Sequence, residues 1–150
     1  MAYIDVVTLA EAKTFLRVDD GFTADDTLIT LLINVAGEYI ERYTNHMLYS
    51  RNKDYVVFDG EKRVYDTPIT AVVDPASEDD YEVAQYETYR VYSVSQDTIT
   101  LTVGYDVADV PSGLKLEMLN LINDLYHGNE DVDNGDAIDK RLSKYKRHII

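Results

Sequence analysis

The spacing of apolar residues changes twice along this 150-residue chain, and that change most constrains its fold. Apolar side chains first recur with the period of a helix, then alternate with the period of two that is typical of strands, and finally return to the helical period. This order predicts an α+β fold built as a single domain, 1–150. Its expected parts are two N-terminal helices in 1–48, an inserted antiparallel β region in 49–105, a closing helix near 111–127 within 106–128, and a C-terminal amphipathic docking segment in 129–150.

The N-terminal part carries the signals of two helices. Thr8 and Glu11 form a capping box, which predicts a helix over residues 9–17. Thr23 or Asp25 then caps a second helix that runs to about residue 43. This helix is apolar over most of its circumference, so we expect it to be buried on two sides, within the subunit and against a neighbour. Its main stripe comprises Leu28, Leu32, Val35, Ala36, Tyr39 and Tyr43, widened by Ile29, Ile33 and Ile40.

Turn residues and proline delimit the later elements. Residues 88–94 and 98–103 both alternate, and the short polar link between them, at residues 96–97, predicts that they pair as a hairpin. Pro111 has the fixed φ that suits a helix start. Gly128 is expected to stop the closing helix.

The charge balance is strongly acidic. There are 28 Asp and Glu residues against 14 Lys and Arg residues, a net charge of −14. Such a surface repels nucleic acid. Simple solubility, the wall of a channel that DNA passes through, and a mimic of DNA are all compatible with it. No apolar run approaches the ~20 residues that a membrane helix requires, and the N-terminus lacks a signal-peptide pattern, so we expect a soluble intracellular protein with no membrane partner.

Catalytic and metal-binding patterns are missing or fail on spacing. The chain has no cysteine. Residues 129–139 resemble a calcium loop, but its glycine and its closing glutamate are not in the required positions. His46, His127 and His148 lack metal-ligand spacing, and no serine lies in a nucleophile elbow. We therefore expect no catalytic residue, no metal site and no cofactor, and hence no enzyme.

Two features favour contacts with other proteins. Thirteen tyrosines accompany no tryptophan, and most lie in the β region, where they suit an interface or equally a half-buried sheet face. The candidate subunit-interface residues are Ile29, Ile33, Ile40, Tyr43, Tyr89 and Tyr92. Residues 140–150 carry five bases and no acid, which suits docking onto an acidic protein or favourable charge at a helix end. The candidate docking residues are Ile138, Lys140, Arg141, Leu142, Lys144, Tyr145, Arg147, Ile149 and Ile150.

The order and spacing of these helical motifs resemble a known family. The chain has Thr8-Leu9-x-Glu11-Ala12-Lys13, then Asp25-Asp26-x-Leu28-Ile29, then Val110-Pro111 and a closing helix to Leu125-Tyr126. In this it resembles the head–tail connector (adaptor, or head-completion) proteins of long-tailed bacteriophages. The resemblance implies a ring of about twelve copies at the head–tail junction of the virion, assembled in the host cytoplasm. The ring would bind the portal protein, through the C-terminal segment here. It would extend the DNA channel without sequence-specific binding and present a surface to the next head-completion (stopper) or tail protein.

A second hypothesis remains open at this stage. An acidic chain of this size could mimic DNA and inhibit a host DNA-binding protein, provided that its carboxylates are spaced like phosphates along one face. The basic C-terminal end argues against this function.

Overall fold

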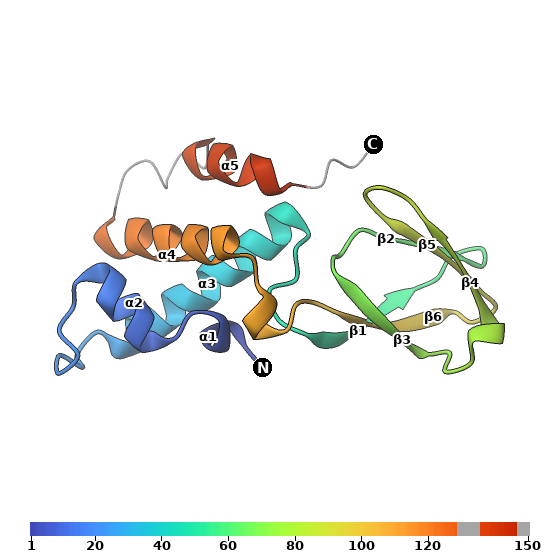
Figure 1. Ribbon diagram of the computed structural model, residues 1–150, viewed down its shortest axis with the longest axis horizontal. Helices are drawn as coiled ribbons and strands as arrows, with labels where there is room; N and C mark the ends of the chain where they lie inside the picture. Colours follow the sequence, from blue (N-terminus) through green and yellow to red (C-terminus); the bar gives the residue numbers. More distant parts are fainter. Residues whose placement is uncertain (129–135, 147–150) are drawn as a thin grey trace.

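The computed structural model describes residues 1–128 and 136–146. The helices gather at one end of the molecule and two small sheets at the other, and the chain passes from α3 into β1 between them (Figure 1). The fold is therefore α+β, as predicted. The helices are α1 (Tyr3–Val6), α2 (Leu9–Leu16), α3 (Asp26–Thr44), α4 (Ser112–His127) and α5 (Asp136–Leu142), and the strands are β1 (Arg51–Val56), β2 (Glu61–Val64), β3 (Ile69–Asp74), β4 (Tyr81–Gln85), β5 (Arg90–Val94) and β6 (Thr98–Val103).

The predicted capping box at the start of α2 is confirmed. The Thr8 hydroxyl accepts from the backbone N–H of Glu11 at 3.2 Å, and the Glu11 carboxylate accepts from the backbone N–H of Thr8 at 2.9 Å. The helix ends at Leu16 because Arg17 adopts the left-handed conformation, with φ of 60°. These bonds satisfy two backbone donors that the first turn of a helix leaves free.

A buried lysine holds the turn between α2 and α3. Lys13 is only 3 % exposed, and its ammonium donates to the carbonyls of Asp20 and Phe22 at 3.0 and 2.7 Å. It also pairs with the Asp26 carboxylate at 2.9 Å, in the first turn of α3. Three acceptors match the three protons of the ammonium group, so the charge is fully compensated. The sequence pattern alone does not indicate this role of Lys13.

The helical core forms on one side of α3. This helix contacts α1, α2, α4 and α5, and α4 runs alongside it (Figure 1). The predicted closing helix is confirmed as α4. Pro111 precedes its first residue, and Gly128, with φ of 63°, follows its last. The buried residues of this core are Val6, Val7, Ala12, Leu16, Ile29, Ile33, Ala36, Ile40, Leu48, Leu114, Met118, Leu121, Ile122, Ile138 and Leu142.

The six strands form two antiparallel three-stranded sheets, ordered β1-β6-β3 and β2-β5-β4. The predicted hairpin of residues 88–94 and 98–103 is therefore wrong, since β5 and β6 lie in different sheets. The physical reason is burial: Tyr92 and Val94 of β5 and Leu101 of β6 are inward residues of one core, which the two sheets enclose. Strand β5 pairs instead with β4, which lies just before it in sequence, and with β2.

Gly104 ends β6 at a point where the chain passes close to the residues that lead into β1. Its φ is 108°, and a Cβ at this position would overlap the backbone carbonyl of Tyr49. Glycine alone permits both this dihedral angle and this close approach. The contact joins the last strand to the segment that links α3 to β1, and thereby helps to position the sheets against the helices.

Candidate functional site

The predicted docking segment packs against its own chain. Ile138 and Leu142 of α5 are 4 % and 2 % exposed, and both belong to the helical core. The Tyr39 hydroxyl donates to the Asp139 carboxylate at 2.7 Å, and the Tyr43 hydroxyl donates to the Asp139 carbonyl at 3.0 Å. Burial and this carboxylate raise the pKa of Tyr39 to about 12. The prediction that Ile138 and Leu142 face a partner is thus corrected: their amphipathic pattern reflects packing on α3 and α4.

The bases of this segment differ in their pairing and in their exposure. Arg141 donates to Asp124 at 2.8 Å and lies 3.6 Å from the carboxylate of Glu117, which is also 3.4 Å from Lys144. Lys140 is exposed, and the Lys144 side chain is 60 % exposed. The predicted docking residue Tyr145 is half-buried, with its hydroxyl against Gly113 of α4. The remaining three predicted docking residues, Arg147, Ile149 and Ile150, lie outside the described residues.

The predicted subunit contacts on α3 are likewise corrected. Ile29, Ile33 and Ile40 are each 0 % exposed, because α4 and the shorter helices cover this side of the helix. They offer no surface to another copy. Tyr43 is half-buried and holds α5, as described above.

The two candidate tyrosines of the β region differ. Tyr92 is 1 % exposed and lies in the core between the sheets, so its proposed role at a surface is wrong. Tyr89 is half-buried, stacks on Tyr86 at 4.7 Å between ring centroids, and lies 5.3 Å from Tyr65. This cluster of three rings leaves Tyr89 partly available to a partner, and its assignment to an interface stays a prediction.

Sequence analysis missed the apolar residues of α3 that do face outward. Leu28, Leu31 and Val35 are 46 %, 57 % and 42 % exposed. They recur at intervals of three and four residues, so they lie along one face of the helix, opposite the buried isoleucines. Leu28 and Val35 belong to the main apolar stripe that the sequence predicts. In a helix that is apolar over most of its circumference, however, this pattern does not indicate which side the rest of the chain covers.

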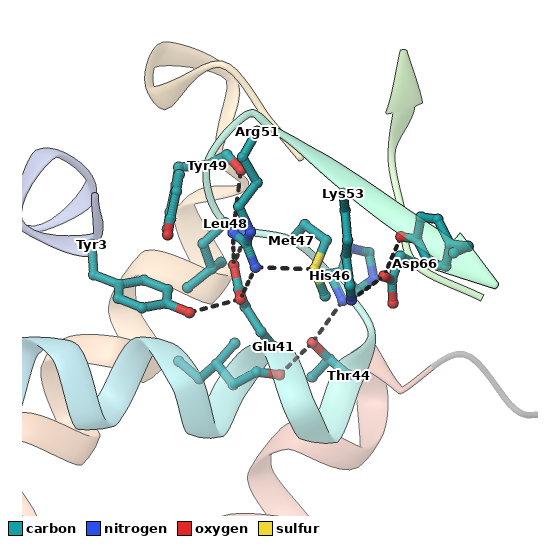
Figure 2. Close-up of polar contacts among 12 residues, drawn as sticks. Tyr3, Glu41, Thr44, His46, Met47, Leu48, Tyr49, Arg51, Lys53 and Asp66 are labelled. Atoms are coloured by element: carbon teal, nitrogen blue, oxygen red, sulfur yellow. Dashed lines mark hydrogen bonds and ion pairs between the residues drawn. The ribbon is translucent and has the colours of Figure 1, made fainter. Parts of the chain in front are cut away.

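A buried carboxylate joins the helical end to the sheet end. Glu41, on the inner side of α3, is 5 % exposed and accepts four hydrogen bonds (Figure 2). Its donors are the Tyr3 hydroxyl at 2.7 Å, the Leu48 backbone N–H at 2.7 Å, and Arg51 at 3.0 and 2.6 Å. Burial and the adjacent Glu41 raise the pKa of Tyr3. Since the donors come from α1, from the linker and from β1, one side chain fixes these three segments against α3.

Beside Glu41 the surface is hollowed between α3 and β1. The groove has a volume of about 500 Å³ and is lined on its α3 side by Val35, Glu38 and Arg42. On its β side, Lys53 pairs with the Asp66 carboxylate at 2.7 Å. This lining is charged and mixed in sign, and the groove opens beside the exposed row of α3. It fits contact with another protein surface better than an enclosed small-molecule site.

Within residues 1–128 and 136–146, no group of three or more Asp, Glu or His side chains is placed to hold a metal ion. In the same residues, none of the helices has the length and apolar character needed to cross a bilayer.

Comparisons with known proteins agree with this architecture. The family model of phage gp6-like head-tail connector proteins matches residues 6–104, which span α2, α3 and the whole β region. A search among curated proteins finds no match. The solved structures that share the fold include two from gene transfer agent particles. One is a chain from the neck of an empty gene transfer agent (GTA) particle computed with C6 symmetry, with 15 % identity and a TM-score of 0.75.

The other is a chain from the virion of a native gene transfer agent particle, with 14 % identity and a TM-score of 0.72. Each alignment covers 100 % of this chain and 94 % of the solved one, so the likeness includes both the helical and the sheet ends. Because the family model covers most of the chain, from before α2 to the end of β6, the protein belongs to the phage gp6-like head-tail connector family, whose role is structural.

Proposed function

We propose that this protein is a ring subunit at the head–tail junction of a virion. In this role it binds the portal vertex, extends the DNA channel, and presents a surface to the next head-completion or tail protein. The observation that carries the proposal is the family match over residues 6–104. It is supported by the shared fold of a chain from the neck of a gene transfer agent particle. A ring of about twelve copies is compatible with the sixfold symmetry used for that neck.

The charge of the chain suits this location. A net charge of −14 on each copy gives a ring whose lumen repels DNA, so that DNA passes without binding. Basic residues in the lumen would instead displace counterions from DNA and hold it in place.

Mass measurement of the protein alone and mixed with the portal protein of its phage tests the proposal. We expect a complex whose mass equals the portal plus a ring of this chain. A protein that stays monomeric in both samples would contradict the proposed function. Co-purification with a host nuclease or repressor, and not with portal, would favour the DNA-mimic hypothesis in its place.

We further propose that the portal contact is made by the end of the chain, with the exposed Lys140 and Lys144 leading into residues 147–150. Removal of residues 138–150 is an unsuitable test, because it would take Ile138 and Leu142 out of the helical core. Truncation after Lys146 leaves those residues in place. We expect this truncation to abolish portal binding while circular dichroism and the melting temperature stay unchanged. A matched control is Arg63→Ala, which removes an exposed base from the β region. Portal binding at the wild-type level by the truncated protein would refute this assignment.

A further inference from the structure

The outward face of α3 carries an apolar row with no partner among the described residues. Leu28, Leu31 and Val35 form this row, and each has more than two fifths of its surface exposed, Leu31 the most at 57 %. A row of large apolar side chains along one face of a rigid 19-residue helix is the usual form of a helix-mediated contact. We call it the α3 row.

The α3 row is also free of charge, which is unusual in this chain. Residues 27–37 contain no acid and no base, although 28 % of the whole sequence is charged. Two copies that each carry a net charge of −14 repel one another, so they can associate only where the repulsion is outweighed by apolar contact with few carboxylates. The α3 row meets this requirement.

A second row lies on the outer face of α4, which is turned away from the helical core. Helix α4 packs against α3 and buries Leu114 and Met118 in the shared core, while Leu116 is 50 % exposed. Leu119 and Asn123 follow Leu116 at helical spacing and are half-buried, and Leu119 also packs against the edge of the helical core. Residues 118–123 carry no charge, and of the two charged neighbours of Leu116, Lys115 pairs with Glu11 at 2.7 Å and Glu117 is buried. Since α3 and α4 pack against each other through their buried residues, the exposed Leu31 and Leu116 each lie on a face of their helix that is turned away from the shared core. We call the outer face of α4 the α4 row.

We propose that the α3 row of one copy packs against the α4 row of the next copy. This inference rests on the proposed ring function and specifies the contact that builds the ring. A head-to-tail contact uses two different faces on each subunit, and repetition of such a contact closes a ring when the rotation between subunits permits. Two unlike rows, one on α3 and one on α4, supply this pair of faces.

Single charge substitutions test each row separately. Leu31→Glu places a carboxylate in the α3 row, and Leu116→Glu places one in the α4 row. Phe58→Glu is the matched control, because Phe58 is 72 % exposed and lies in the β region, away from both rows. All three positions are exposed, so we expect the three variants to have the melting temperature of the wild type. Burial of an unpaired carboxylate in a contact should raise the protein concentration required for ring assembly at least ~10-fold.

Mixing of the two row variants gives the decisive measurement. At a concentration where the wild type and Phe58→Glu assemble, each variant alone should form no ring by mass photometry or analytical ultracentrifugation, with or without portal. A mixture of Leu31→Glu and Leu116→Glu retains one intact pair of faces, so it should give dimers and nothing larger. Wild-type rings formed by either row variant would overturn the inference while leaving the proposed function in place. Failure of the wild type itself to form rings or bind portal would overturn both.

Discussion

Replacement of Glu41 by glutamine tests whether one buried carboxylate holds the helices and the sheets in register. Glutamine keeps the shape of the side chain but turns one carboxylate oxygen into an amide NH₂. Each oxygen of Glu41 faces two donors, one the backbone N–H of Leu48 with Arg51, the other the Tyr3 hydroxyl with Arg51. Either orientation of the amide therefore sets its NH₂ group against a guanidinium N–H of Arg51, and the charge that compensates Arg51 is lost.

The expected cost follows from burial. Breaking a buried ion pair by removing one partner costs about 3–5 kcal/mol. The Arg51 side chain is 27 % exposed and can partly rehydrate, which favours the lower limit. We therefore expect Glu41→Gln to lower the free energy of unfolding by about 3 kcal/mol, or the melting temperature by about 6–12 °C for a chain of this size. Tyr3→Phe removes one of the four bonds and should cost about 1 kcal/mol.

Urea unfolding followed by circular dichroism measures these changes. Glu38→Gln is the matched control, because Glu38 lies on the same helix with an exposed side chain, and its substitution should stay within about 0.5 kcal/mol of the wild type. The cost of Tyr3→Phe should shrink when Glu41 is already glutamine, because the two side chains share a bond. Equal stability of Glu41→Gln and Glu38→Gln would contradict this role of Glu41.

Three further substitutions probe other parts of the fold. Lys13→Met should lower the free energy of unfolding in urea by about 2 kcal/mol, because three acceptors lose their donor. The control Lys115→Met removes an exposed ion pair and should lower it by less than about 1 kcal/mol. Gly104→Ala should destabilise the protein far more than Gly128→Ala, measured by thermal unfolding: both have positive φ, but only at Gly104 does a methyl group meet backbone atoms. Burial and Asp139 raise the pKa of Tyr39 to about 12, so its contribution to stability is complete below the unfolded value of about 10 and is lost as the pH rises toward 12. Tyr39→Phe should therefore reduce the fall in unfolding free energy over that pH range, and an unchanged fall would contradict this assignment.

The elements that sequence analysis predicted correctly depend on local signals. The capping box of Thr8 and Glu11 and the stop at Gly128 act within one helical turn, so the residues themselves determine those helix ends. Pairing between strands is not local. Strand β6 lies between β1, whose residues precede it by about fifty positions, and β3, and no short motif encodes that choice over a hairpin with β5.

The candidate site was harder to predict, because an apolar pattern does not indicate which surface will bury it. Ile29 and Leu28 are adjacent, equally apolar residues of α3, yet one is fully buried and the other is 46 % exposed. The choice between them is made by α4, which begins more than eighty residues later in the chain, at Ser112. The same ambiguity affected Ile138 and Leu142, whose spacing fits docking onto a partner as well as packing on their own subunit.

Helix α3 thus carries three separate roles on three parts of its circumference. Its buried isoleucines form the helical core, Glu41 near its end binds α1 and β1, and its outward row is available to another copy. If the row builds a ring as proposed, the orientation of each sheet end relative to that ring is set through Glu41. A Glu41→Gln subunit should then still assemble through its intact rows, while its sheet ends hold their positions less uniformly. In electron-microscopy averages of such rings, we expect sharp density for the helices and weaker density for the strands. Equally sharp density in both parts would contradict the claim that Glu41 sets the orientation of the sheet end.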